Sequence, residues 1–295
     1  MNLKTAADVL HQYEKYGLNL YEVGLKYEHK QSDIDNDTIY KLMLQQWLVM
    51  KEAINQGMDE SNPQIKGKII QREAYKLKAN IGTGKSICGE TTTKAMAYAL
   101  STMEVNISMG RIVAAPTAGA SGVLPGTLKA IQEANHFNDD QIIEALFAAG
   151  VVGMIIAKQA SISGAKGGCQ AEIGTASAMA AASVVYLMGG SIHQAFDAAA
   201  IAINNLMGLI CDPVAGLVEV PCHKRNAIGA SNALICAEMV LAGMPSIIPF
   251  DEVVIAMKQV GDLMPACHRE TATGGIAITK TAKKYEKEIM TYHVN

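Results

Sequence analysis

The longest uncharged stretch of the chain, IGTASAMAAASVVYLMGGSIHQAF, runs from Ile173 to Phe196. Its apolar side chains are mostly those of alanine, and Gly189-Gly190-Ser191 breaks it in two. A membrane-spanning helix gains its free energy of insertion mainly from Leu, Ile and Phe side chains, which are scarce here. The segment Ser191-Ile192-His193-Gln194 has the form of a capping box that opens a helix. The stretch therefore predicts a buried hairpin of two helices packed through small side chains.

The rest of the chain is also patterned for helices. Apolar residues recur at helical spacing, as at Ile39, Met43 and Trp47, whereas alternating strand patterns are almost absent. Helices are expected over residues 37–57, 64–79, 89–109, 139–160, 195–209, 223–241 and 251–264, with a short amphipathic helix and a charged connector over 3–30. Aromatic residues make up only 5% of the chain, and Ala, Gly and Ser crowd the apolar faces. The sequence predicts an all-α fold.

The predicted architecture is a single helical domain over residues 1–295. We divide it into a helical apron over 1–80, a catalytic core over 81–280 and a charged tail over 281–295. No repeat or low-complexity linker marks a boundary inside the chain. The helices are expected to surround a site that is built from loops rich in glycine and proline.

Composition narrows the classes of partner. The chain has 295 residues, of which 49% are hydrophobic, so it can bury a sizeable core. Its formal net charge of −3 gives no broad basic field, which argues against nucleic acid or a membrane surface as a partner. Six cysteines are too few for a disulfide scaffold, and the N-terminus lacks the apolar core of a signal peptide. We expect a cytoplasmic protein that binds a small molecule.

Three cysteines lie beside helix breakers. Cys169 follows Gly167-Gly168, Cys211 precedes Asp212-Pro213, and Cys222 follows Pro221. A cysteine that only fills a core, as Cys236 does in its apolar run, needs no such neighbours, whereas a metal ligand must be held by a rigid, kinked backbone. Three thiolates suit a 4Fe-4S cluster with one open iron. A zinc site that also uses His223 is the competing metal interpretation.

Two further stretches suit the binding of a small anion. The segment from Thr117 to Gly122 is too rich in glycine for a helix interior and too apolar for a solvated loop, so its backbone N–H groups need partners such as a carboxylate. A plain turn between packed helices is the alternative. Arg269 offers a planar fork of donors close to Gly274-Gly275, which suits a carboxylate, although an ordinary surface ion pair would look the same.

Taken together, these motifs resemble the iron–sulfur L-serine dehydratases, and specifically the alpha chain of the two-subunit bacterial form. The resemblance spans residues 60–280. It rests on Ala115-Pro116-Thr117-Ala118-Gly119-Ala120-Ser121-Gly122, on Lys166-Gly167-Gly168-Cys169-Gln170-Ala171-Glu172, on Cys211-Asp212-Pro213 through Pro221-Cys222, and on Arg269-Glu270-Thr271. It implies a helical lyase that converts L-serine to pyruvate and ammonia, a step of serine catabolism that feeds gluconeogenesis.

The resemblance also implies roles for individual residues. Cys169, Cys211 and Cys222 would hold a 4Fe-4S cluster whose open iron acts as a Lewis acid on the substrate hydroxyl. The predicted substrate-binding residues are Thr117, Ala118, Gly119, Ser121, Gly122, Arg269 and Thr271. Lys166 and His223 are expected to tune the cluster or relay a proton. The main base would come from a separate beta chain as partner. Single-chain relatives end in a cysteine that can reach the cluster, and the segment from Met290 to Asn295 has none.

Three alternatives stay open at this point. A cysteine desulfidase on the same fold would release sulfide in place of water. A helical iron–sulfur protein without catalysis would carry electrons or sense oxygen, and it would be expected to use four cysteine ligands. A pyridoxal-phosphate enzyme with Lys166 as the Schiff-base lysine would need an α/β fold and a phosphate site after a strand, which this sequence does not indicate.

Overall fold

The computed structural model describes residues 3–291 and confirms the all-α prediction, because no strand is present within that range. The α-helices are α1 (Ala6–Tyr16), α2 (Leu20–Ser32), α3 (Asn36–Met58), α4 (Glu90–Ile107), α5 (Val123–Asn135), α6 (Asp139–Gln159), α7 (Gly164–Gly167), α8 (Thr175–Leu187), α9 (Ile192–Leu206), α10 (Cys222–Leu241), α11 (Phe250–Leu263) and α12 (Lys280–Thr291). Short helical turns are η1 (Ala74–Asn80), η2 (Ala118–Ala120), η3 (Gln170–Gly174), η4 (Val214–Gly216), η5 (Ala266–His268) and η6 (Gly275–Ile278).

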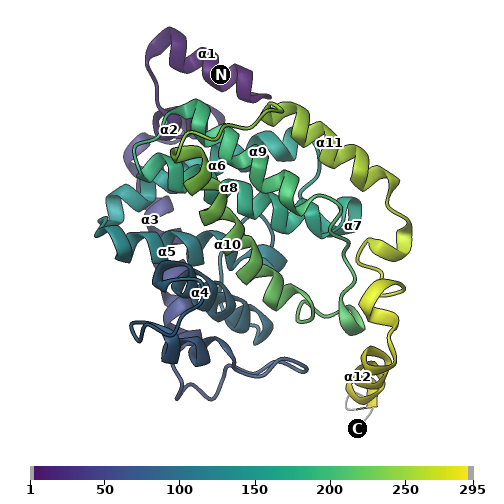
Figure 1. Cartoon of the computed structure of the whole chain (residues 1–295). Coiled ribbons are helices and arrows are strands. Elements are labelled where there is room, and N and C mark those ends of the chain that lie inside the picture. Colours follow the sequence, from purple (N-terminus) through teal and green to yellow (C-terminus); the bar gives the residue numbers. More distant parts are fainter. Residues whose placement is uncertain (1–2, 292–295) are drawn as a thin grey trace.

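Helix α8 is the centre of the molecule. It packs against α5, α6, α9 and α10, and these helices surround it in Figure 1. Every residue from Thr175 to Val185 is buried, so this helix has no polar face. Its alanines, among them Ala176 and Ala180, are fully enclosed. A helix that is apolar all round must be covered on every side, and small side chains let its neighbours come close.

The predicted helical hairpin is confirmed. Helices α8 and α9 are joined by a tight turn in which Gly189 has a φ of +78°, a conformation that favours glycine. Ser191 caps α9, because its Oγ accepts a hydrogen bond from the backbone N–H of Gln194 and the Gln194 side chain accepts from the backbone N–H of Ser191. This reciprocal capping box fixes where α9 begins.

Two glycines of α5 set how closely this helix approaches α4. A methyl group added at Gly122 would lie 2.2 Å from the carbonyl oxygen of Ala99, and one added at Gly126 would lie 2.6 Å from the Ala99 nitrogen. Both contacts are to backbone, which cannot rotate away. The close α4–α5 contact holds the Thr117–Gly122 loop at the beginning of α5.

The structure departs from the sequence prediction over residues 64–79. We expected a charged helix there, but only the 3-10 turn η1 forms, from Ala74 to Asn80. Two buried carboxylates from distant helices and loops take the backbone N–H groups that a helix would use. Glu219 accepts from the N–H groups of Lys68, Ile69 and Ile70. Glu104 accepts in the same way from Glu73 and Ala74.

The connector predicted after the first helix is also helical. Asn19 caps α2 by accepting a hydrogen bond from the Glu22 N–H, and the Glu22 carboxylate accepts from the Asn19 N–H. The sequence therefore contains the capping-box pattern Asn-x-x-Glu, although the charged residues of this segment led us to expect a connector.

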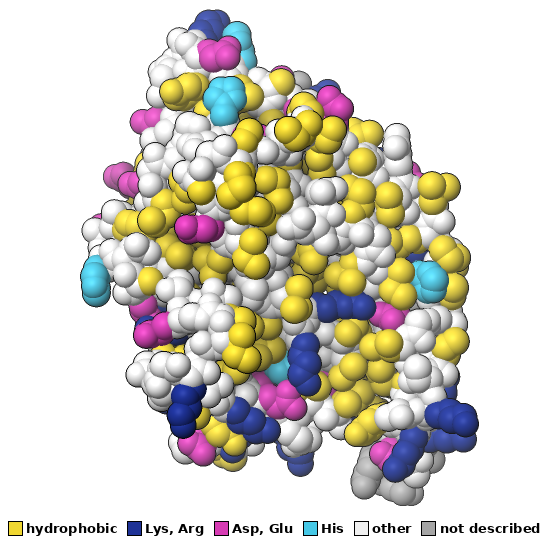
Figure 2. Space-filling model, viewed as in Figure 1, with side chains coloured by type: hydrophobic (Ala, Val, Ile, Leu, Met, Phe, Trp, Pro, Cys, Tyr) yellow, Lys and Arg dark blue, Asp and Glu magenta, His cyan; other side chains and the backbone are white. Residues whose placement is uncertain are grey.

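One helix is long and apolar enough to cross a membrane. This is α6, and 67% of its most apolar window is buried inside the molecule. It packs against α2, α3 and α8, which is the environment of a core helix. Figure 2 shows hydrophobic side chains spread over the upper part of one face, with Lys and Arg side chains more frequent in its lower part, in the area of α4 and α12.

Candidate metal centre

Cys169 lies on a kinked turn that leads into α8. Gly168, with a φ of +75°, precedes it, and a methyl group there would lie 2.5 Å from Sδ of Met264. The turn continues as the π-helical segment η3, a geometry that is frequent at functional sites. Gln170 fixes the turn, since its side chain donates to the carbonyl oxygen of Met257 and accepts from the Gly208 N–H.

Cys211 is held by a segment from the far end of the sequence. Its N–H donates to the carbonyl oxygen of His268 at 2.9 Å, and its carbonyl accepts from the Glu270 N–H at 2.8 Å. The next residue, Asp212, accepts from the Ile276 N–H at 2.8 Å. Gly275 has a φ of +58°, and a methyl group there would lie 2.2 Å from the Asp212 carboxylate. The segment between α11 and α12 therefore fixes the position of Cys211.

Cys222 is the first residue of α10, where the free N–H groups of a helix favour negative charge. Arg225 lies one turn later on the same helix. Its guanidinium donates to the carbonyl oxygen of Ile210 at 2.7 Å and forms an ion pair of 3.0 Å with Asp212. Its positive charge also lies near the sulfur of Cys169, where it favours the thiolate. Arg225 thus links the three segments that carry these cysteines.

The three thiols are buried and close enough to influence each other's charge. Their exposed fractions are 1% for Cys169, 3% for Cys211 and 6% for Cys222. Burial raises the pKa of Cys169 to about 11, although Arg225 opposes the shift. Burial also raises the pKa of Cys211 and of Cys222, and the neighbouring sulfurs raise both further. Three buried thiols that disfavour one another's ionisation would gain from a bound cation or cationic cluster.

The chemistry of these residues suits a cluster of several irons. Across residues 3–291, no group of three His, Cys, Asp or Glu side chains converges closely enough to hold one metal ion. A cluster of several irons takes its thiolates at separate corners, so its ligands need not converge on one point. The donor set of three buried thiols beside a guanidinium has the chemistry that such a cluster requires.

The Thr117–Gly122 loop lies beside the turn of Cys169. The Thr117 hydroxyl donates to Oε1 of Glu172 at 2.6 Å. Asn226, which is fully buried on α10, accepts from the Gly122 N–H and donates to the carbonyl oxygen of Gly119. We expected a bound anion to satisfy the backbone of this loop, and the Asn226 amide satisfies part of it instead. Ser121 is also buried, and its hydroxyl donates to the carbonyl oxygen of Ala118.

Glu172 is a site residue to which the sequence analysis gave no role. It lies three residues after Cys169, and its carboxylate is near Gly119 and Gly164. A methyl group added at Gly164 would lie 2.6 Å from Oε2 of Glu172 and 3.1 Å from Sγ of Cys211. Burial raises the pKa of Glu172, and the hydrogen bond from Thr117 only partly opposes this.

The two candidate proton carriers lie in different environments. Lys166 is exposed on α7 and lines a cavity of about 510 Å³ together with Gln170 and Met257. His223 is buried on α10, and its Nε2 lies 3.1 Å from Oε1 of Glu104 on α4. Its other ring nitrogen has no hydrogen-bond partner among the described residues. The structure therefore pairs His223 with a carboxylate rather than with a cysteine.

The backbone of Arg269 pairs with that of Cys211 in an isolated β-bridge, and Thr271 follows two residues later. The Arg269 guanidinium donates to the carbonyl oxygens of Met264 and Asp262, at the end of α11. The Thr271 hydroxyl donates to the carbonyl oxygen of Ala266. In this structure both side chains thus bind the backbone of their own segment, and their assignment to the substrate stays a prediction.

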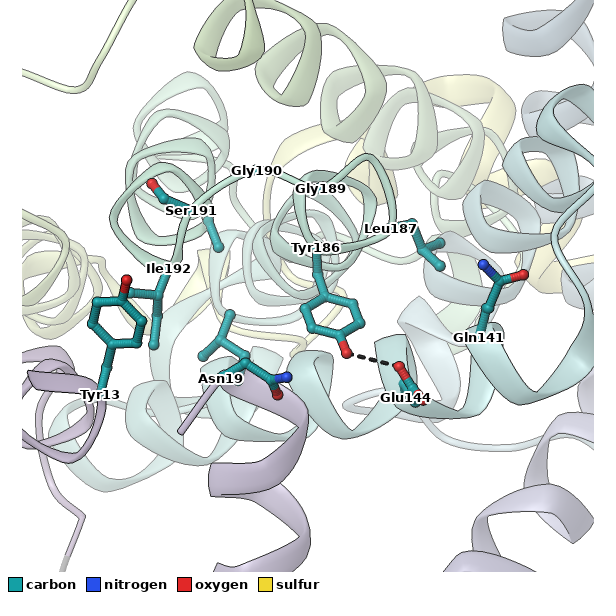
Figure 3. Close-up of a pocket in the computed structure, with 12 residues that line it drawn as sticks. Tyr13, Asn19, Gln141, Glu144, Tyr186, Leu187, Gly189, Gly190, Ser191 and Ile192 are labelled. Atoms are coloured by element: carbon teal, nitrogen blue, oxygen red, sulfur yellow. Dashed lines mark hydrogen bonds between the residues drawn. The ribbon is translucent and has the colours of Figure 1, made fainter. Parts of the chain in front are cut away.

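A separate cavity of about 400 Å³ lies where α2, α6 and the α8–α9 turn meet (Figure 3). Its polar side chains include Tyr13, Asn19 and Gln141, and the Tyr186 hydroxyl donates to Glu144 at 2.8 Å. The lining carries no cysteine and no cation, and its one charged group is already paired. This cavity therefore lacks the groups that a metal or a substrate carboxylate would need.

Comparisons with known proteins point to one family. The family model described as serine dehydratase alpha chain matches residues 15–277. The probable L-serine dehydratase, alpha chain, of Bacillus subtilis (strain 168) is 47% identical over 268 residues, which cover 91% of this chain and 89% of that protein. The L-serine dehydratase, alpha chain, of Peptoniphilus asaccharolyticus is 43% identical over 288 residues, 98% of each chain.

A longer relative matches over part of its length. The L-serine dehydratase of Streptomyces coelicolor is 35% identical over 283 residues, which cover 93% of this chain and 60% of that protein. The family match and the two alpha-chain relatives extend over most of the sequence, including all three cysteine segments. The chain therefore belongs to the serine dehydratase alpha chain family.

Proposed function

We propose that this protein is an L-serine dehydratase alpha chain that converts L-serine to pyruvate and ammonia with a 4Fe-4S cluster on Cys169, Cys211 and Cys222. The observation that carries the proposal is the group of three buried thiols linked by Arg225. The names of the relatives support the reaction and its substrate. All six cysteines are free thiols, which is in keeping with the reducing cytoplasm.

The reaction needs help at two atoms of serine. Hydroxide is a poor leaving group, and the proton on Cα is only weakly acidic. A bound cluster would supply Lewis acidity for the hydroxyl group. Arg225 would offset the negative charge of the thiolates, and the buried walls around Cys169 would keep competing water out. The aminoacrylate that elimination leaves would tautomerise and hydrolyse to pyruvate and ammonia without further catalysis.

We propose that the base for the Cα proton comes from a beta chain. The family and these relatives are named as alpha chains, which supports a two-subunit enzyme. Within this chain, His223 is bound to Glu104, and Lys166 lies exposed on α7. We propose that these two residues tune the site or relay a proton.

We propose that residues around the cysteine site bind the substrate carboxylate. The candidates are Arg269, Thr271 and the loop residues Thr117, Ala118, Gly119, Ser121 and Gly122. For Arg269 to grip a carboxylate, its guanidinium would have to share or release the carbonyl oxygens of α11. In the loop, the Thr117 and Ser121 hydroxyls and the Gly122 N–H already donate to Glu172, to the carbonyl oxygen of Ala118 and to Asn226, so these donors would likewise have to be shared.

The test is iron and sulfide analysis of protein purified without oxygen. Cys169→Ala, Cys211→Ala and Cys222→Ala should each lose the cluster, whereas Cys236→Ala, which removes a buried thiol of the core, should keep it. Retention of wild-type iron in all four variants would contradict the site. Turnover of L-serine and L-cysteine by the complete enzyme then separates a dehydratase from a desulfidase. A cluster protein that acts on neither would be a non-catalytic iron–sulfur protein.

A further inference from the structure

Glu172 is half-buried, and it differs from the fully buried carboxylates in having no cation or backbone donor. Asp212 is paired with Arg225, Glu104 with His223, and Glu219 with three backbone N–H groups. Glu172 accepts one hydrogen bond, from the Thr117 hydroxyl to Oε1. None of the ion pairs within residues 3–291 involves it, and its Oε2 accepts no hydrogen bond from the described residues.

Such a carboxylate is unfavourable unless something else balances its charge. Burial raises the pKa of Glu172, and the Glu270 carboxylate raises it further. Removing an ionised group from water costs free energy that one hydroxyl donor does not recover. A ligand that brings a positive charge with several N–H donors would recover it.

The carboxylate also lies beside the cysteine site. Glycines at positions 119 and 164 lie against it, and a side chain at either position would meet its oxygens. The same space at Gly164 borders Sγ of Cys211. A small molecule that reached Cys211 would therefore also be near Oε2 of Glu172.

We propose that Glu172, positioned by Thr117, binds the α-ammonium group of the substrate amino acid. This inference rests on the proposed function, which makes the ligand an amino acid with a cationic nitrogen. An ammonium group has three donors and no acceptor, and it complements a carboxylate oxygen that lacks a partner. Glu172 would thereby select amino acids over hydroxy acids that carry the same carboxylate and hydroxyl groups.

The experiment compares Glu172→Gln with wild type in the complete two-chain enzyme, loaded without oxygen. The glutamine keeps the shape and an acceptor for Thr117 but removes the charge. KM for L-serine should rise roughly ten- to a hundredfold, because a hydrogen bond between charged groups is lost. Inhibition by 3-hydroxypropionate, which has the carboxylate and hydroxyl of serine but no ammonium, should stay the same or strengthen. Iron and sulfide per chain should match wild type.

A second variant and a control complete the test. Glu172→Asp keeps the charge on a shorter side chain and should bind L-serine more tightly than Glu172→Gln. Glu252→Gln removes a charge from the exposed face of α11 and should leave KM unchanged. An unchanged KM in Glu172→Gln, or an equal loss of affinity for L-serine and 3-hydroxypropionate, would overturn the role of Glu172 but not the proposed function. A wild-type complex that does not turn over L-serine would overturn the proposed function and this role with it.

Discussion

Arg225 shows how one side chain can organise a site assembled from separate segments. It lies one helical turn after Cys222, it donates to the carbonyl oxygen of Ile210 just before Cys211, and its charge favours the thiolate of Cys169. Asp212 holds the guanidinium in place from the opposite side. A lysine could not make these contacts together, because a single ammonium group lacks the planar fork of donors.

We therefore expect Arg225→Gln to lower the affinity of the chain for the proposed cluster. Loss of a group that orients and neutralises the ligands of a metal typically lowers its affinity roughly ten- to a hundredfold. Iron and sulfide per chain, measured after anaerobic dialysis against a chelator, should fall below those of wild type. Lys224→Gln is the matched control, since the neighbouring side chain is 71% exposed and pairs only with Glu73. Equal iron retention in the two variants would contradict the role of Arg225.

At this scale the sequence indicated the ligand candidates but not their partners. Cys169, Cys211 and Cys222 could be proposed because each has a glycine or proline close by. Glu172 follows Cys169 by three residues, and Arg225 follows Cys222 by three. This spacing places each side chain on the same side of a helical turn as its cysteine. That pattern is too common to be decisive by itself. Their importance comes from contacts with residues distant in sequence, which no local pattern contains.

Among the elements, local periodicity predicted those helices whose buried apolar residues recur at helical spacing. Helices α3, α4, α6, α10 and α11 lie within a few residues of the expected ranges. The helix predicted over residues 64–79 does not form as expected. The carboxylates of Glu104 and Glu219 accept hydrogen bonds from the backbone N–H groups of this segment and replace the acceptors that a helix would supply. A helical pattern is a local preference, and buried carboxylates from elsewhere can override it.

The contact between α4 and α5 leads to a prediction about stability. Gly126→Ala would place a methyl group 2.6 Å from the nitrogen and 2.9 Å from Cα of Ala99, so the helices must move apart. We expect a loss of about 1–3 kcal/mol in the free energy of unfolding, as for other overpacked cores. Gly150→Ala on α6, where a methyl group meets nothing within 4 Å, should be neutral or slightly stabilising. Urea unfolding of both variants tests this, and similar midpoints would contradict it.

Asp139, at the beginning of α6, ties three helices together and predicts a pH dependence. Burial by itself raises its pKa, but hydrogen bonds from Lys51, Trp47 and Gln132 outweigh this and lower the pKa from 3.8 to about 2. A carboxyl group whose pKa is lowered by folding stabilises the folded state above the unfolded value. That contribution is lost as pH falls from 3.8 towards about 2.

Asp139→Asn should therefore remove part of the acid sensitivity. The free energy of unfolding of the variant should be lower than that of wild type at pH 7, and the two should converge as the pH falls through this range. The measurement is a series of urea unfolding curves from pH 7 downward. The comparison is Asp140→Asn, because the exposed Asp140 carboxylate accepts, among residues 3–291, only from the Tyr40 hydroxyl. Parallel curves for wild type and Asp139→Asn would rule out the linkage.

Across the whole molecule, the cysteine site is continuous with the apolar core, because Cys169 and Cys211 belong to the same cluster of buried side chains as the alanines of α8. Helix α8 and its neighbours form the apolar centre, while the segment from α11 to α12 runs along one side and carries the contacts to Cys211. In Figure 1 helices α1 and α12 lie at opposite ends of the molecule. The site is thus built where the last part of the chain meets the central helices.

This arrangement, together with the proposed function, predicts how the chain behaves with and without its partner. The chain alone should bind iron and sulfide, because all three cysteines belong to it, but its turnover of L-serine should be slow. Addition of the beta chain should raise kcat roughly a hundredfold or more, the usual contribution of a general base. Steady-state pyruvate formation at several ratios of the two chains measures this. Full activity of the chain alone would place the base within it.

The backbone pairing of Cys211 with His268 and Glu270 has a consequence for biosynthesis. A ribosome adds residues from the N-terminus onward, so a nascent chain contains all three thiols long before their supporting segment exists. Under the proposed function, iron would then be delivered after translation rather than during it. A polypeptide that terminates early, before Ile276, would present reactive sulfurs without the frame that orients them.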